Sequence, residues 1–384
     1  MNGMNGMNDL FGAPGFEPTL AAAQARLAAV RPGDYARTRN AIHGAVTRLS
    51  PYITHGYFSL PQVLAGVRHK YRLDAEHKFV YELGWREFFH HVWQNHGNGI
   101  FESLHEGVLP DAAYVRELPA DIRHGATGVP VIDCAVRELY ATGYLHNHAR
   151  MWLASYVVHL RKVHWKTGAD WLYRHLLDGD LASNHLSWQW VAATGSHKPY
   201  LFNAENVARY APPAWHSPGT VIDTSYEALD ALARHPRPAP GGARGLDAVA
   251  EPECSTMPPA GLPGLEFDRG AVPSDAWLVH PWAQREAPPG PPAVGVFVAA
   301  FHAQWPWSRA RWEFVATRMK ALCPRVFWVE GELPLRVRTI AEPHLAPFWQ
   351  LHDAAPVPRL FAAPDQPCHS FTQFYKAVSA SLQG

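Results

Sequence analysis

A proline- and glycine-rich stretch divides this 384-residue sequence into two parts with different secondary-structure patterns. Between residues 235 and 292 it contains HPRPAPGGARG, TMPPAGLPG and REAPPGPPA. Proline lacks a backbone N–H and both residues interrupt regular structure, so such segments sustain neither long helices nor central strands. We therefore expect residues 235–292 to form a largely irregular linker, although an ordered path across the surface also fits the pattern.

Residues 18–234 have the pattern of an all-helical domain. Apolar residues recur at helical spacing, Pro or Ser marks several helix starts, and Gly marks helix ends. The predicted helices are PTLAAAQARLAAV (18–30), SLPQVLAGVRHKY (59–71), HKFVYELGWREFFHHVWQNHG (77–97), VPVIDCAVRELYATG (129–143) and HNHARMWLASYVVHLRKVHW (146–165). The last is apolar on nearly all sides, which is typical of a central buried helix.

Residues 293–384 have the pattern of a small α/β domain. AVGVFVAAF and RVFWVEG are apolar runs typical of buried strands, and RARWEFVATRMKAL between them reads as an amphipathic helix. VRTIAEP offers a third strand, so the strand–helix–strand order predicts a parallel sheet. At the other end of the chain, residues 1–17 begin with the low-complexity run MNGMNGMND, and we expect them to be a disordered tail.

Charge and cysteine content narrow the functional classes. Lys+Arg and Asp+Glu both number 34, so net charge gives no argument for nucleic acid, although a balanced sum can hide a local basic patch. The four cysteines form no CxxC pair, which predicts no zinc or iron–sulfur site and fits a cytoplasmic protein. The histidine groups at 90–91 and 146–148 share no ligand spacing, so we expect no metal. No apolar run reaches the roughly 20 residues of a membrane span.

Two polar clusters lie on predicted helices. In YELGWRE, Glu82 and Arg86 are four residues apart and share a helix face with Trp85 beside them; a surface ion pair would explain them. In HNHARM, Arg150 stands on the rim of an almost wholly apolar helix. A cation in that position needs a carboxylate partner, which the later segment DGD (178–180) can supply.

A third cluster, DGDLASNHLSWQW (178–190), follows directly. Asp180 or Ser183 can cap the next helix, but a cap does not explain the second carboxylate, Asn184 and two tryptophans. Together the three clusters indicate a large planar ligand with polar edges, held among helices. TRLSPYITHG (47–56), where hydroxyls and an arginine precede a helix start, is a plausible cradle for a diphosphate.

These segments resemble the helical FAD-binding domain of the photolyase/cryptochrome family. TRLSPYITHG, ELGWREFF, TGVPVIDCAVRELYATGYLHNHARM and LLDGDLASNHLSWQWVAATG stand in the family's order and spacing, from about Pro18 to Pro213. The resemblance implies FAD, with an ion pair between Arg150 and Asp178 over the flavin and Asn184 facing flavin N5. The implied FAD-binding residues are Tyr35, Thr47, Arg48, Leu49, Ser50, Arg86, Arg150, Asp178, Asp180 and Asn184.

The resemblance also implies a function, the light-dependent repair of cyclobutane pyrimidine dimers in DNA by electron transfer from reduced FAD. It assigns Glu82, Trp85, Asn147, Met151 and Trp190 to the pocket for a flipped-out dimer. It assigns Trp188 and Trp165 to the inner and middle positions of the electron-transfer chain, and Arg39 to a DNA phosphate.

The sequence departs from the family at several points. No antenna domain is recognisable before residue 18, so an antenna chromophore is not expected; residues 293–384 are either a relocated, reduced antenna domain or an unrelated interaction domain. No tryptophan matches the outermost member of the electron-transfer chain, for which Tyr114 or Trp152 can substitute. His148 replaces a common DNA-contacting arginine, which favours single-stranded DNA as the substrate.

Two other functions fit the same sequence. The first is a cryptochrome-like flavin photosensor that keeps FAD without repairing DNA. The second is a helical DNA-binding or scaffold protein that has lost flavin. Flavin absorption by the purified protein would exclude the second, and a dimer-repair assay separates the first from a repair enzyme.

Overall fold

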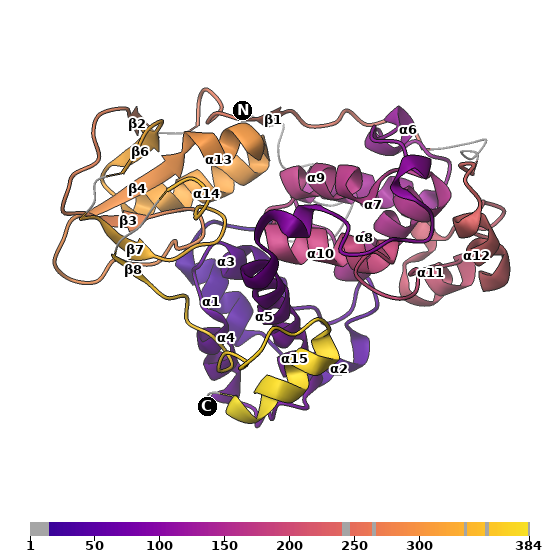
Figure 1. Cartoon of the computed structure of the whole chain (residues 1–384), viewed down its shortest axis with the longest axis horizontal. Helices are drawn as coiled ribbons and strands as arrows, with labels where there is room; N and C mark the ends of the chain where they lie inside the picture. Colours follow the sequence, from indigo (N-terminus) through magenta and orange to yellow (C-terminus); the bar gives the residue numbers. More distant parts are fainter. Residues whose placement is uncertain (1–14, 240–245, 263–265, 334–335, 350–352, 383–384) are drawn as a thin grey trace.

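The structure, a computed structural model, describes residues 15–239, 246–262, 266–333, 336–349 and 353–382. A helical part and an α/β part lie side by side, and the C-terminal helix returns to the helical part (Figure 1). Of the tail expected at residues 1–17, all but the last three residues lie outside the described ranges. No helix in the described ranges combines the length and the hydropathy that crossing a membrane requires.

The helical part confirms the predicted fold class. Its α-helices are α1 (Leu20–Ala28), α2 (Pro32–Thr38), α3 (Ser50–Thr54), α4 (Leu60–Arg68), α5 (Lys78–His96), α6 (Ala120–Arg123), α7 (Pro130–Thr142), α8 (Asn147–Ser155), α9 (Trp165–His175), α10 (Leu181–Ala192), α11 (Ala204–Tyr210) and α12 (Tyr226–Arg234). Local sequence explains several boundaries. Ser59 and Gln62 form a capping box at the start of α4, and Gly143 ends α7 with a positive φ of 65°.

The helix predicted over residues 146–165 is broken. Helix α8 ends at Ser155, a π-helical turn follows over Tyr156–Leu160, and α9 begins only at Trp165. Lys162 lies between them with a φ of 54°, in the left-handed region that a continuing helix cannot use. Its buried ammonium donates to three backbone carbonyl oxygens at 2.6–2.8 Å, which offsets the strain of that turn.

The α/β part contains a six-stranded sheet, as the strand–helix–strand pattern predicted. Its strands are β2 (Phe267–Asp268), β3 (Trp277–Val279), β4 (Ala293–Val298), β6 (Val326–Val329), β7 (Arg338–Ile340) and β8 (Asp353–Ala355), in the order β2-β6-β4-β3-β7-β8, and neighbouring strands are parallel. Helices α13 (Ala299–Gln304) and α14 (Arg309–Leu322) follow β4 and cover the sheet (Figure 1). A Cβ on Gly295 would collide with Met319, so glycine lets α14 lie close to β4.

The irregular linker predicted over residues 235–292 is too long, because part of this stretch forms strands. Strands β2 and β3 of the sheet come from its second half, and β1 (Cys254–Ser255) pairs antiparallel with β5 (Trp307–Ser308). These strands are two or three residues long, so their apolar signal is lost among the prolines. Earlier in the stretch, Val249 N donates to the His124 carbonyl at 2.8 Å. This contact fits the second alternative from the sequence, an ordered path across the surface.

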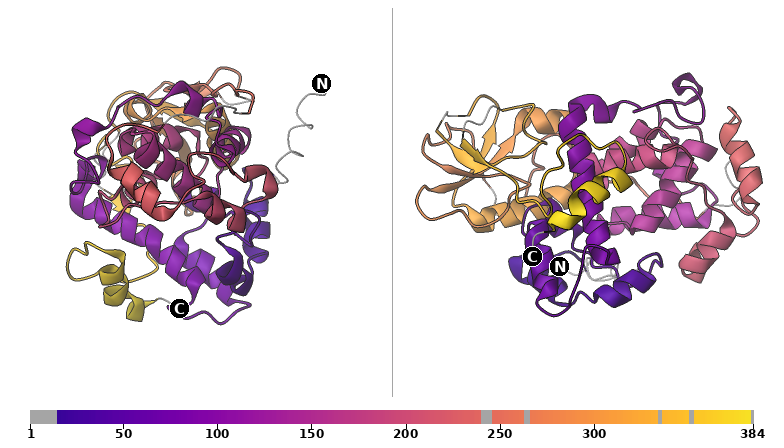
Figure 2. Two further views of the ribbon diagram at one scale, coloured as in Figure 1. Left: turned by 90° about the vertical axis from the view of Figure 1, so that its right-hand side faces the viewer. Right: turned by 60° about the horizontal axis from the view of Figure 1, so that its bottom comes forward.

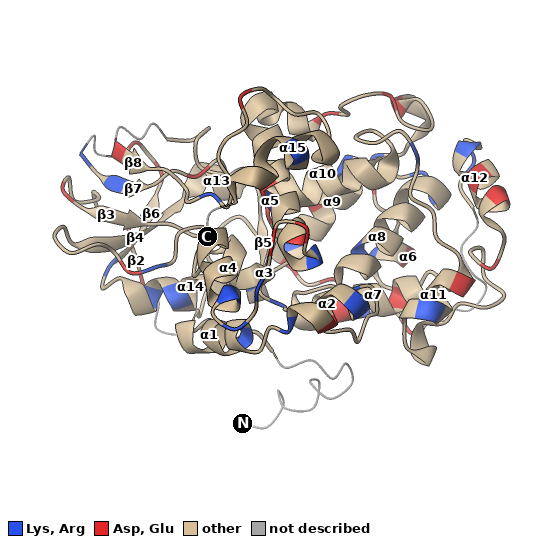
Figure 3. Ribbon diagram, turned by 90° about the horizontal axis from the view of Figure 1, so that it is seen from below, with Lys and Arg blue, Asp and Glu red and all other residues tan. Residues whose placement is uncertain are grey.

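The two parts share one apolar core, which contains residues of α4 and α5 together with residues of the sheet, such as Leu64, Phe88 and Phe297. Helix α15 (Phe371–Val378) crosses α5 on the side away from the sheet (Figures 1 and 2). Seen from below, Lys and Arg are interspersed with Asp and Glu over the helices (Figure 3). The shared core places the turn between α9 and α10 at the junction of the two parts.

Candidate functional site

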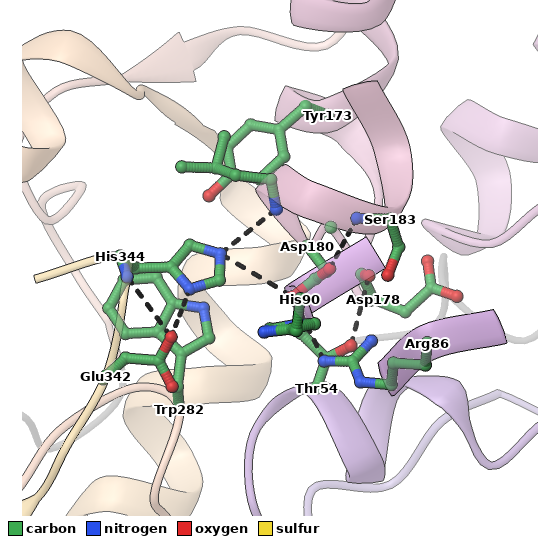
Figure 4. Close-up of polar contacts among 12 residues, drawn as sticks. Thr54, Arg86, His90, Tyr173, Asp178, Asp180, Ser183, Trp282, Glu342 and His344 are labelled. Carbon is green, nitrogen blue, oxygen red and sulfur yellow. Dashed lines mark hydrogen bonds and ion pairs between the residues drawn. The ribbon is translucent and has the colours of Figure 1, made fainter. Parts of the chain in front are cut away.

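The turn Asp178–Gly179–Asp180 connects α9 to α10 at this junction (Figure 4). Asp180 caps α10, because one carboxylate oxygen accepts from Ser183 N at 2.8 Å. The other oxygen accepts from Arg86 Nη2 at 3.2 Å and lies 3.0 Å from His90 Nε2. Burial alone would raise the pKa of Asp180, but Arg86 and His90 hold it well below its usual value. The capping residue is therefore also the acceptor for a cation.

Arg150 and Asp178 form the ion pair that the resemblance implies. Arg150 Nη2 lies 2.9 and 2.8 Å from the two carboxylate oxygens, and Nε donates to the Leu145 carbonyl at 2.7 Å. The Tyr144 ring lies near two guanidinium groups, 5.5 Å from that of Arg150 and 5.9 Å from that of Arg48. This contact joins the predicted phosphate turn to the ion pair, and burial raises the pKa of Tyr144 to about 12.

Asn184 lies one helical turn after Asp180 and is buried. Its Nδ2 donates to the Ala169 carbonyl at 2.8 Å, which fixes the amide and leaves its oxygen able to accept from a ligand. The neighbouring Ser183 Oγ is buried and has no hydrogen-bond partner among the described residues. A fixed acceptor, an unpaired hydroxyl and a nearby ion pair fit a planar ligand with polar edges such as a flavin.

The turn over residues 47–50 has an unusual backbone. Arg48 has a positive φ of 52°, and Thr47 Oγ1 accepts from the N–H of buried Leu49 at 3.3 Å. Helix α3 begins at Ser50, as its Ser-Pro sequence predicted. Tyr35 on α2 packs edge-on against Phe79 at 5.6 Å, and burial raises its pKa. The turn therefore carries the hydroxyls and the cation that a diphosphate cradle requires.

Among the predicted dimer-pocket residues, Asn147 and Met151 contact each other, and Glu82 contacts two cations outside that set. Glu82 contacts Lys78 at 3.1 Å and Arg39 at 3.4 Å, so the alternative of an ion pair between Glu82 and Arg86 is wrong. The reason is that Asp180 takes Arg86, and a sequence cannot show a partner so distant along the chain. On α8, Asn147 Nδ2 lies 3.7 Å from Met151 Sδ across one helical turn.

Trp85, which the resemblance assigns to that pocket, is covered on one face in this structure. The ring of Phe371 on α15 stacks on Trp85 with centroids 3.9 Å apart and planes 8° apart. Trp190, the other expected wall, is 38% exposed and tilts against Tyr200 at 5.8 Å. The sequence could not reveal the cover on Trp85, because it comes from almost 300 residues further along the chain.

Both tryptophans predicted for electron transfer are buried. A Cβ on Gly168 would collide with Trp188, so this glycine lets the indole lie against α9. Trp165 lies at the start of α9, and its Nε1 donates to Ser103 Oγ at 3.0 Å. Each indole therefore has a fixed position within the helical core.

Tyr114 is better placed than Trp152 to extend this pair. The ring of His164 lies 6.4 Å from that of Tyr114 and 5.6 Å from that of Trp165. Trp152 instead stacks on His148 at 4.7 Å and lies near Phe202. The sequence left these two aromatic residues as equal substitutes for the missing outer tryptophan, and the geometry favours Tyr114.

A cavity of about 550 Å³ lies between the helical and the α/β parts. Arg86, His90 and Asp180 line it on one side, and Trp282 and Glu342 on the other. Four residues around the 178–180 turn were given no role from the sequence, namely His90, Glu342, His344 and Arg311. The local sequence around a histidine or an arginine does not indicate a partner that lies far along the chain. The described residues contain no cluster of side chains that could hold a metal ion.

Comparison with known proteins finds matches to the helical residues that form this site. Residues 79–214 match the family model described as the FAD-binding domain of DNA photolyase. A deoxyribodipyrimidine photo-lyase of Streptomyces griseus is 36% identical over 155 residues, which are 40% of this chain and 33% of that protein. A cryptochrome DASH of Idiomarina loihiensis is 32% identical over 192 residues, which are 47% of this chain and 42% of that protein.

These matches cover only part of each protein. The chain spans between a third and just under half the length of the curated relatives it matches. Among solved structures, a cryptochrome of Synechocystis sp. is 26% identical with a TM-score of 0.46, over 58% of this chain and 52% of the cryptochrome. The residues that match the family model all lie in the helical part.

Proposed function

The helical part of this chain belongs to the photolyase/cryptochrome family and binds FAD, and on that premise we propose that the protein repairs cyclobutane pyrimidine dimers in light. The observation that supports this most is the group formed by Asn184 and the Arg150–Asp178 ion pair. A photolyase and a cryptochrome DASH are both among the relatives, so the family alone does not choose between repair and photosensing.

FAD, when bound and reduced, would supply an electron to the dimer after absorbing light and take it back once the ring has split. The chain's contribution is to position the flavin and to tolerate its negative charge. A carboxylate at position 184 would repel that charge, whereas the neutral amide of Asn184 accepts a hydrogen bond and adds none. Arg150, held by Asp178 and the Leu145 carbonyl, keeps a cation nearby.

The proposed substrate is DNA with a flipped-out dimer, preferentially single-stranded. Glu82 is a hydrogen-bond acceptor for a thymine edge, and its two cationic neighbours Lys78 and Arg39 can also reach a phosphate. Lys and Arg are interspersed with Asp and Glu along the ribbon in Figure 3, so we expect duplex DNA to find few phosphate contacts. Flipping a base from a single strand costs less than flipping it from a duplex.

Illumination of the reduced protein with dimer-containing oligothymidine tests this proposal. We expect dimers to disappear in light and to persist in the dark, measured by chromatography of the oligonucleotide. Glu82→Ala should slow repair while the flavin absorption of the purified protein stays unchanged. Persistence of dimers in both single-stranded and duplex DNA would exclude the repair function.

A flavin photosensor is the second candidate, because α15 covers one wall of the expected dimer pocket. Phe371 stacks on Trp85, so that face of the indole is closed to a base in this arrangement of the chain. A photosensor needs a bound, photoreducible flavin but no open lesion pocket. Photoreduction without dimer loss, in both the wild type and a variant lacking the Phe371 ring, would favour this candidate.

A further inference from the structure

Arg311 on α14 reaches from the α/β part to the turn that carries Asp178 and Asp180. It is fully buried, its Nη2 donates to the Gly179 carbonyl at 2.6 Å, and its Nη1 donates to the Tyr173 carbonyl at 3.2 Å. Its guanidinium also lies over the Trp307 ring, 4.2 Å from the centroid. Nη1 and Nη2 of Arg311 thus donate to backbone carbonyls of the helical part and not to a carboxylate.

His344 holds the other side of the same turn (Figure 4). Its Nε2 accepts from Leu181 N, the first N–H of α10, at 3.1 Å. Nδ1 therefore carries the proton and donates to Glu342 Oε1 at 2.5 Å. The indole of Trp282 stacks on the imidazole with centroids 4.4 Å apart and planes 15° apart. The tautomer and the ring plane of His344 are both fixed by the α/β part.

The two contacts enclose a short piece of backbone. Arg311 binds the carbonyl of Gly179, and His344 binds the N–H of Leu181, so the main chain on both sides of Asp180 is held. A Cβ on Gly179 would collide with Arg311 Nη1, which explains why glycine stands there. Asn184 Nδ2 is fixed separately, by the Ala169 carbonyl one helix away.

We propose that Arg311 and His344 are positioning residues for FAD: the α/β part uses them to fix the 178–180 turn and the first turn of α10 against the cofactor. The proposal rests on FAD binding by the helical part and not on dimer repair. Neither residue touches the reacting atoms. Each acts through the backbone that presents Asp178, Asp180 and Asn184, so the helical part depends on the α/β part for a complete site.

Arg311 is buried and no carboxylate is bonded directly to it. A substitution at this position can therefore distinguish a positioning role from a packing role. Replacing a buried charge by an apolar residue of similar volume is often neutral or stabilising. If Arg311 only filled space, Arg311→Met would therefore fold and bind FAD like the wild type. If Arg311 positions the turn, the same variant would fold yet bind FAD more weakly, because the Gly179 and Tyr173 carbonyls lose their donors.

The test is a titration of FAD-free protein with FAD, followed by flavin fluorescence, in a set of variants. We expect Arg311→Met and His344→Phe each to raise the dissociation constant of FAD roughly tenfold, the effect of losing one strong hydrogen bond. Arg311→Lys keeps one donor and should restore part of the affinity. Arg318→Met is the matched control, since Arg318 lies two turns away on the same helix and contacts the Gln284 carbonyl instead.

Hydrogen exchange of the FAD-free protein supplies a second readout that involves neither flavin nor DNA. We expect faster exchange at Leu181 and Ser183 in Arg311→Met and His344→Phe, and unchanged exchange there in Arg318→Met. Wild-type FAD affinity in Arg311→Met, or equal weakening in Arg318→Met, would overturn the proposal. Should Arg311→Met fail to fold, Arg311→Lys and His344→Phe decide the matter. If the wild-type protein binds FAD but repairs no dimers, while Arg311→Met and His344→Phe bind FAD more weakly, only the proposed repair function fails.

Discussion

Glu138 shows how one buried side chain can make the stability of the protein depend on pH. Burial raises its pKa from 4.5 to about 7, and nearby Arg48 opposes that rise. Between those two pH values the folded protein keeps a proton that the unfolded chain releases. The contribution of Glu138 to stability is therefore complete below about pH 4.5 and is lost as the pH rises to about 7.

We predict that Glu138→Gln flattens this pH dependence, since the glutamine stays neutral. Between pH 5 and 7.5 the free energy of unfolding should decrease in both proteins. The decrease in Glu138→Gln should be smaller than that in the wild type by about 1–3 kcal/mol. Urea denaturation at both pH values measures it. The exposed Glu117 supplies the control: Glu117→Gln should keep the wild-type pH dependence, and an unchanged slope in Glu138→Gln would contradict the prediction.

Electron transfer through the buried aromatic residues gives a second test on single side chains. Trp188→Phe should abolish photoreduction of the oxidised flavin, because phenylalanine is far harder to oxidise than tryptophan. Tyr114→Phe should slow photoreduction more than Trp152→Phe does, since only Tyr114 lies next to the His164–Trp165 pair. Absorbance of the flavin under illumination follows the rate. Equal rates in Tyr114→Phe and wild type would leave Tyr114 out of the path.

Sequence reasoning predicted residue pairs only where a local pattern existed. Arg150 on an apolar helix required an acid, and DGD supplied one, so the ion pair with Asp178 could be predicted. Asp180 also had a local signal as a helix cap. Nothing in the sequence connected Asp180 with His90, because such pairings arise from tertiary packing.

Helices and strands were predictable to different degrees for the same reason. Helix ends carry caps and glycines, so α4, α5 and α7 begin and end within three residues of their predicted limits. Strands β2 and β3 have two and three residues, too few for an alternating pattern, and the neighbouring strands supply their hydrogen bonds. The position of α15 against α5 is likewise a tertiary fact that no local pattern contains.

Helix α15 is held on α5 by polar contacts as well as by aromatic ones. The Glu87 carboxylate accepts the backbone N–H groups of Leu360 and Phe361, and His91 Nε2 accepts from Cys368 N at 2.9 Å. These bonds anchor the segment that leads into α15, while Phe371 itself covers Trp85. Removing that one ring should therefore uncover Trp85 without releasing the whole segment.

We predict that Phe371→Ala lowers the free energy of unfolding by about 3–5 kcal/mol, as expected for a buried phenylalanine. If Trp85 belongs to the dimer pocket, the same variant should bind dimer-containing oligonucleotide more tightly, measured by fluorescence anisotropy. Lys376→Ala, on the exposed side of α15, should change neither quantity. Weaker or unchanged DNA binding in Phe371→Ala would remove Trp85 from the pocket.

Across the whole molecule, the helical and α/β parts contribute differently to the proposed function. The helical part carries the residues expected to contact FAD and DNA. The α/β part contacts the backbone at the 178–180 turn through Arg311 and His344. Charge is balanced over the chain, with 34 basic and 34 acidic residues, and both signs are interspersed along the ribbon in Figure 3. If the protein binds DNA as proposed, we expect that binding to depend on few phosphate contacts.

Salt dependence of DNA binding tests that inference. For single strands, the logarithm of the affinity should fall with the logarithm of salt concentration by about 0.7 for each phosphate contact. Arg39→Ala should lower this slope by about one contact. Nε of Arg39 donates to Glu82 at 3.4 Å and Nη1 to the Ala36 carbonyl at 3.0 Å, so we expect Nη2 to contact the phosphate. Arg234→Ala on α12, far along the chain and paired with Asp230, should leave the slope unchanged. An unaltered slope in Arg39→Ala would mean that Arg39 forms an ion pair with Glu82 and does not contact a DNA phosphate.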